Sequence, residues 1–88
     1  MNILEIRDNE GETYDRYTVV YDVIGDSKGH YLALAMSAHP FHPMGFGQHC
    51  TAQPGNHLGK KIGFAKLPPD CRKLVRRDLC APSRRRRS

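Results

Sequence analysis

Four of the five histidines and one of the three cysteines of this chain lie within residues 39–57. Imidazole and thiolate groups bind zinc, and a thiol beside a histidine can act as a nucleophile next to its base. Structural zinc sites usually combine two tight ligand pairs, whereas Cys50 has no second cysteine nearby in sequence. We therefore expect no cofactor, no catalytic residue and no metal at His39, His42, His49 or Cys50. Of the three functions considered for this chain, a zinc or thiol enzyme therefore ranks third, after protein binding and nucleic-acid binding.

The same segment is predicted to form one long irregular loop. Three prolines and three glycines interrupt any helix, and the residues do not alternate as they would in a strand. Loops longer than about 12–15 residues are uncommon in compact domains unless they are functional or disordered, and the aromatic and imidazole content argues against disorder. The loop contains Phe41, Met44 and Phe46, which are of types that anchor protein interfaces. We interpret it as a recognition element.

Positive charge is concentrated in the second part of the chain. Residues 1–26 carry a net charge of −5 and residues 27–88 a net charge of +10, of which Arg84–Arg87 contribute four. Basic side chains on one face of a helix could contact phosphates, although such a face is also the ordinary solvated surface of a small protein. Nucleic-acid binding is therefore the second interpretation. The residues expected to bind a partner are Phe41, His42, Met44, Phe46, Gln48, His49, Lys60, Lys61, Arg72, Lys73, Arg76 and Arg77.

Hydrophobic periodicity predicts the elements that position these residues. Alternating apolar residues predict strands at residues 2–7, 14–24, 30–36 and 60–65, with turns at 9–12 and 25–29. Prolines 68 and 69 are compatible with a helix start, and an apolar stripe continues to Leu79, before Ala81 and Pro82 end the helix.

The predicted fold is α+β: a small antiparallel sheet of three to four strands, packed against one C-terminal helix, with a long irregular loop. We expect a single domain over residues 1–82 and a disordered basic tail over residues 83–88. The core is predicted to contain Leu4, Ile6, Val19, Leu32, Leu34, Ile62, Phe64, Leu74, Val75 and Leu79.

Composition excludes some classes of protein. No apolar run approaches the roughly 20 residues of a membrane span, and the first residues lack the features of a signal peptide. The odd number of cysteines does not predict a disulfide framework, so Cys71 and Cys80 are expected to be reduced and to behave as small hydrophobic residues. We therefore expect a cytoplasmic protein without a membrane partner.

Several sequence blocks resemble a family of small proteins from phages, prophages and other mobile elements. The blocks include Pro40-Phe-His-Pro-Met-Gly-Phe-Gly-Gln-His49 and His57-Leu-Gly-Lys60, followed by Leu67-Pro68 and Cys71, and their most distinctive parts are Phe46-Gly-Gln-His49 and His57-Leu-Gly-Lys60. The resemblance covers about residues 13–80, so the Arg84–Arg87 tail lies outside it. It implies a genetic context and no established activity.

The sequence thus predicts a non-enzymatic binding protein that acts stoichiometrically on a host protein or nucleoprotein complex. The most specific hypothesis, by analogy with other proteins of mobile elements, is an inhibitor of a host defence system such as CRISPR or restriction. A small basic accessory protein that binds nucleic acid is the alternative. No small-molecule substrate is expected.

Overall fold

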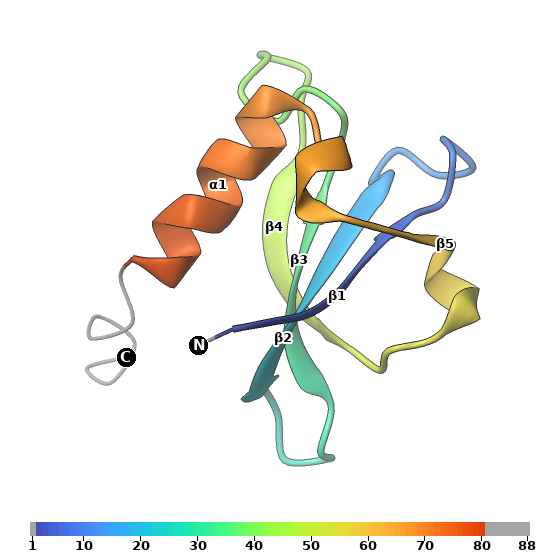
Figure 1. Ribbon diagram of the computed structural model, residues 1–88, viewed down its shortest axis with the longest axis vertical. Coiled ribbons are helices and arrows are strands. Elements are labelled where there is room, and N and C mark those ends of the chain that lie inside the picture. The colour runs from blue at the N-terminus through green and yellow to red at the C-terminus, as the bar shows by residue number, and fades with distance from the viewer. Residues whose placement is uncertain (1, 81–88) are drawn as a thin grey trace.

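The computed structural model describes residues 2–80, which form one antiparallel sheet and one α-helix (Figure 1). The strands are β1 (Ile3–Asp8), β2 (Tyr17–Ile24), β3 (Tyr31–Met36), β4 (Gly47–Ala52) and β5 (Lys60–Ile62), and helix α1 spans Pro69–Leu79. Two 3₁₀ helices, η1 (Asn56–Leu58) and η2 (Phe64–Lys66), flank β5. The strand order is β4-β3-β2-β1-β5. The predicted α+β class is confirmed, with five strands rather than three to four.

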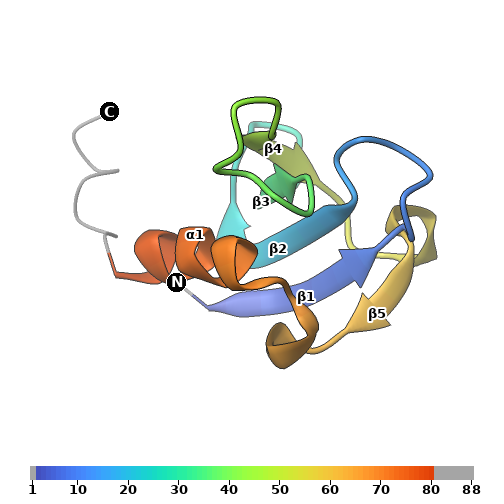
Figure 2. The ribbon, with the colours of Figure 1, turned by 90° about the horizontal axis from the view of Figure 1, so that it is seen from above.

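Helix α1 covers one face of the sheet, and the core lies between them (Figure 2). Alternation along β2 and β3 directs every second apolar side chain toward the helix. The buried cluster comprises Ile6, Tyr17, Val19, Tyr21, Leu34, Met36, Leu67, Cys71 and Val75. Five further predicted core residues are partly buried against this cluster: Leu32, Ile62, Phe64, Leu74 and Leu79.

The predicted position of Leu4 in the core is wrong. Ile3 lies opposite Tyr21 and Glu5 opposite Val20, so Leu4 is an extra residue that forms a β-bulge in β1. A bulge shifts the alternation of side chains by one residue. Ile3 therefore packs against the core, whereas Leu4 is 44% exposed.

The prediction of one uninterrupted loop over residues 39–57 is also wrong, because β4 lies within it. Gly47–Ala52 pairs with β3 along its whole length, from Gly47 opposite Met36 to Ala52 opposite Tyr31. The side chains of β4 are mostly exposed on both faces, so no hydrophobic alternation marks this strand in the sequence. Backbone pairing with β3 stabilises it instead.

A segment between β4 and β5 passes over the second face of the sheet. The backbone N–H of Gly55 donates to Glu5 at 2.9 Å, and Arg7 donates to Asn56 and to the carbonyl oxygen of Gly59. Glu5 and Arg7 flank core-facing Ile6 in β1, so they point to this second face. Their contacts hold the segment that carries the chain from one sheet edge to the other.

Element boundaries and surface cysteines differ in detail from the prediction. The fourth predicted strand ends at Ile62, because residues 64–66 form η2. Cys71 is buried as expected, whereas Cys80 is exposed. The predicted helix end at residues 81 and 82 and the predicted tail lie outside the described residues, as do Arg84–Arg87.

A matched pair of substitutions in β1 tests the bulge and the core. Ile6→Ala should reduce the free energy of unfolding by about 2–5 kcal/mol, because Ile6 is 2% exposed and its truncation leaves a cavity. Leu4→Ala should cost less than about 1 kcal/mol, as expected for a surface position. Urea denaturation measures both values, and equal losses would contradict the register described here.

Candidate binding surface

The predicted recognition loop and the basic helix meet at Phe41. This residue is 45% exposed in the connection between β3 and β4. The Lys73 Nζ lies 5.6 Å and the Arg77 Cζ 5.7 Å from the centroid of its ring. Both distances are within the range of cation–π contacts. The structure thus places these three predicted partner-binding residues together, and we call them the cation–aromatic surface.

The contacts of α1 with β4 determine the position of this surface. The Nε2 of His49 lies 2.9 Å from both carboxylate oxygens of Asp78, and the hydroxyl of Tyr21 donates to the same carboxylate at 2.7 Å. One turn earlier, Leu74 lies against Gly47, leaving only 3.0 Å for a Cβ at that glycine. The last two turns of α1 are thereby held against β4.

The basic residues of α1 are divided between two flanks. Lys73 and Arg77 lie on the flank that faces Phe41, in the connection between β3 and β4. The guanidinium of Arg76 instead lies 5.4 Å from the ring centroid of Phe64, after β5. Arg72 is half-buried, and its Nε has no hydrogen-bond partner among residues 2–80. The predicted single basic face is therefore two surfaces, of which one includes an exposed aromatic ring.

The remaining predicted partner-binding residues are spread over the molecule. Met44, in the same loop as Phe41, is 75% exposed. Phe46 is half-buried, and its ring lies 6.4 Å from that of Tyr14. Gln48 lies on β4, one residue from His49 and hence on the opposite face. Lys60 and Lys61 lie on β5, at the sheet edge opposite β4.

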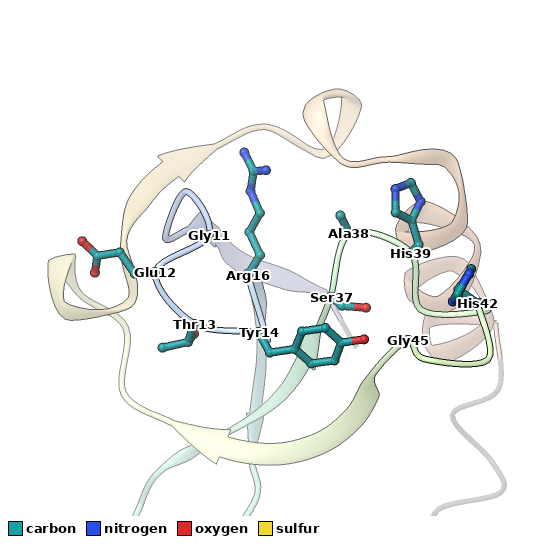
Figure 3. A pocket seen from close by; sticks show the side chains of 10 residues that line it. All are labelled: Gly11, Glu12, Thr13, Tyr14, Arg16, Ser37, Ala38, His39, His42 and Gly45. Carbon is teal, nitrogen blue, oxygen red and sulfur yellow. The ribbon is translucent and has the colours of Figure 1, made fainter.

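An open groove of about 590 Å³ lies on the other side of the loop, between it and the turn that joins β1 to β2 (Figure 3). Tyr14, Arg16, His39 and His42 supply its larger side chains. Gly45 forms part of the lining, and a Cβ there would overlap the carbonyl oxygen of His39. Neither Tyr14 nor Arg16 is among the residues predicted from the sequence to bind a partner. Their proximity to residues 37–45 depends on the antiparallel pairing of β2 with β3.

Ion pairs neutralise two acids of β1 but not the bases of α1. Glu5 pairs with Arg7 at 2.9 Å and Asp8 with Arg16 at 2.7 Å. The hydrogen bond from each arginine is the main reason that the pKa of its carboxyl partner lies below the ordinary value. Within residues 2–80, the lysine and arginines of α1 form no ion pair with an acidic side chain. The charge of these side chains is therefore not neutralised by an acid of the described residues.

The chemistry of the candidate catalytic and metal-binding residues is constrained by β4. His49 faces Asp78 on α1, so neighbouring Cys50 lies on the opposite face of the strand and the two side chains do not pair. Partial desolvation raises the pKa of the Cys50 thiol, although the residue is exposed, and burial raises the pKa of Cys71 to about 11. Both shifts disfavour the reactive thiolate. In the part of the chain that the structure describes, no three histidine, cysteine or acidic side chains are grouped to hold a metal ion.

Comparison of the chain with protein-family models, with curated protein sequences and with solved structures finds no match. The resemblance to proteins of mobile elements therefore stays a prediction from the sequence. Among residues 2–80, no helix is long and apolar enough to cross a bilayer.

Asp78 and Tyr21 were not predicted as parts of the site. They are 57 residues apart, and their contact arises only when α1 packs on β2. Tyr21 could be recognised from the sequence as a residue on the core-facing side of its strand, but no sequence pattern pairs it with Asp78.

Removal of the Tyr21 hydroxyl should loosen the end of α1. Tyr21→Phe should lower the free energy of unfolding by about 1.5–3 kcal/mol, the range for a hydrogen bond to a charged group. Tyr14→Phe is the control, because Tyr14 is 62% exposed and should tolerate the change. Chemical denaturation compares the two variants. Equal stability of Tyr21→Phe and the unmodified protein would show that this bond does not hold the helix.

Chelation should leave the stability unchanged. Among residues 2–80 no three histidine, cysteine or acidic side chains are grouped, so treatment with EDTA should not alter the melting temperature measured by circular dichroism. A decrease that added zinc reverses would identify a metal site and make His39, His42, His49 and Cys50 its candidate ligands.

Proposed function

We propose that this chain is a non-enzymatic binding protein that acts stoichiometrically on a protein partner through its cation–aromatic surface. The observation that carries this proposal is the position of Phe41, exposed and flanked by Lys73 and Arg77. Aromatic and arginine side chains supply much of the binding energy at protein interfaces. An exposed ring beside two cations fits a partner surface that combines an apolar contact with acidic side chains.

The contacts behind this surface support its use in recognition. Leu74 and Asp78, next to Lys73 and Arg77 in sequence, pack against β4. The two cations therefore project from a helix that is held at both turns, which reduces the entropy lost when a partner binds. Exposed Met44 extends the same loop and offers an adaptable apolar contact.

Binding of single-stranded nucleic acid is the second candidate function. It is favoured by the same juxtaposition, because bases stack on aromatic side chains while nearby cations contact the phosphates. Lys60 and Lys61, however, lie at the far edge of the sheet, and Arg76 lies on the other flank of α1. The basic residues thus do not form the continuous groove that usually follows a nucleic-acid backbone.

The partner that we propose is a host protein or nucleoprotein complex. The resemblance to proteins of mobile elements supports this choice and favours an inhibitor of a host defence system.

A pull-down of partners from a lysate of host cells tests the proposal. Wild-type protein and Phe41→Ala should be compared with and without nuclease, followed by affinity measurement on the purified partner. Phe41→Ala should weaken binding by about 2 kcal/mol or more, as for an aromatic hot spot. Its melting temperature should change little, because the ring is exposed in the free protein. Ile24→Ala, at an exposed apolar residue outside the candidate surface, is the matched control.

Nuclease treatment and salt separate the two candidate functions. A protein partner should be retained after nuclease digestion, and its affinity should depend only moderately on salt. Loss of all binding on digestion, with a steep decrease in affinity between 50 and 200 mM salt, would assign the surface to nucleic acid. Unchanged affinity of Phe41→Ala for the partner would exclude the cation–aromatic surface as the recognition element.

A further inference from the structure

The two edges of the sheet differ in their protection against strand pairing. At one edge, β5 has three residues, two of which are lysines. Short, lysine-bearing edges discourage the addition of another strand. At the other edge, β4 has six residues, contains no lysine, arginine, acidic residue or proline, and pairs with β3 without a bulge. Short length and lysine side chains thus protect the edge at β5, whereas neither feature is present at β4.

The hydrogen-bond pattern identifies the free backbone groups of β4. Ser37 donates its backbone N–H to the carbonyl oxygen of Phe46, and bonded pairs recur at every second position of an antiparallel ladder. Gln48, Cys50 and Ala52 therefore direct their backbone groups toward β3. The N–H and C=O groups of Gly47, His49 and Thr51 point away from it, and none has a hydrogen-bond partner among residues 2–80.

Contacts of β4 place this free edge near the chain segments that carry the cation–aromatic surface. Gly47 lies against Leu74 and Pro40, and His49 contacts Asp78. Leu74, Pro40 and Asp78 are the direct sequence neighbours of Lys73, Phe41 and Arg77, respectively. A strand added at this edge would meet the free backbone donors and acceptors of β4. The ring of Phe41 and the cations Lys73 and Arg77, which form no ion pair within residues 2–80, lie on the neighbouring segments.

We propose that the free edge of β4 binds an extended acidic segment of the protein partner by strand addition. Backbone hydrogen bonds to Gly47, His49 and Thr51 would supply the pairing, and Lys73 and Arg77 would select acidic side chains. This inference rests on the proposed function and specifies how the partner is recognised.

The charges favour an acidic segment over a second copy of this chain. In an antiparallel pair of β4 strands, a twofold axis perpendicular to the sheet places both α1 helices on the same face. Lys73 and Arg77 of one copy would then face the same residues of the other. Such a juxtaposition of like charges opposes association, whereas acidic side chains at the same place favour it.

Hydrogen exchange with a defined peptide tests the proposal. The probe is an amidated and acetylated hexapeptide of alternating glutamate and valine, with an alternating lysine and valine peptide as its control. At a peptide concentration ten times the Kd, the amides of Gly47, His49 and Thr51 should exchange about tenfold more slowly. The amides of Gln48, Cys50 and Ala52 should change little, because β3 already accepts from them. The lysine peptide should give no protection.

Two pairs of variants separate backbone pairing from charge. Thr51→Pro removes an outward N–H without removing a bond to β3, and it should weaken peptide binding by about tenfold. Thr51→Val, which loses the hydroxyl but keeps the N–H, should bind like the wild type. Lys73→Glu with Arg77→Glu should abolish binding of the acidic peptide. Arg76→Glu with Arg72→Glu makes the same change of charge on other helix positions and should retain it.

Each other outcome identifies a different mode of binding. Absence of saturable binding, or protection outside β4, would overturn strand addition. Dimers that form through β4 and are lost in Thr51→Pro would assign the edge to a second copy. Protection of the same amides by an oligonucleotide but not by the acidic peptide would assign the surface to nucleic acid. If a captured protein partner depends on Phe41 but is insensitive to Thr51→Pro, the proposed function holds and strand addition is wrong.

Discussion

The carboxylate of Asp78 joins helix α1 to strands β2 and β4, and the position of the cation–aromatic surface depends on this contact. It accepts a hydrogen bond from buried Tyr21 of β2 and contacts His49 of β4, so one side chain of α1 is joined to two strands. This contact fixes the end of the helix, while burial of Cys71 and Val75 fixes its middle. A buried apolar stripe alone would allow the helix to shift along the sheet, whereas directional polar contacts define its position.

Two consequences follow from this placement of α1. Lys73 and Arg77 reach the ring of Phe41 in a loop more than 30 positions earlier, and Arg76 reaches Phe64 on the other flank. The helix also lies beside the edge of β4 and leaves the outward backbone groups of that strand free. Packing of α1 thus brings its basic side chains close to an exposed aromatic ring and to an open sheet edge. Each of these features would be ordinary by itself.

The second face of the sheet has a different role. There Glu5 and Arg7 form an ion pair and bind the segment that crosses from β4 to β5. The hydrogen bond from Arg7 holds the pKa of Glu5 below its ordinary value, so the pair stays charged at neutral pH. Glu5 and Arg7 are thus occupied by contacts within the fold. Lys73 and Arg77, by contrast, form no ion pair with an acidic side chain of residues 2–80.

Sequence alone determined the elements whose stability comes from local patterning. Alternation identified β2 and β3, and the apolar stripe of α1 identified the helix and most of its buried residues, because these patterns reflect one buried face. Tertiary structure decided the features that depend on contacts between residues far apart in the chain. Strand β4 is held by backbone bonds to β3 and shows no hydrophobic alternation, and the bulge at Leu4 follows from its pairing with β2. The contacts of Asp78 and of Phe41 join residues far apart in the chain, and no periodicity in a single sequence encodes such pairs.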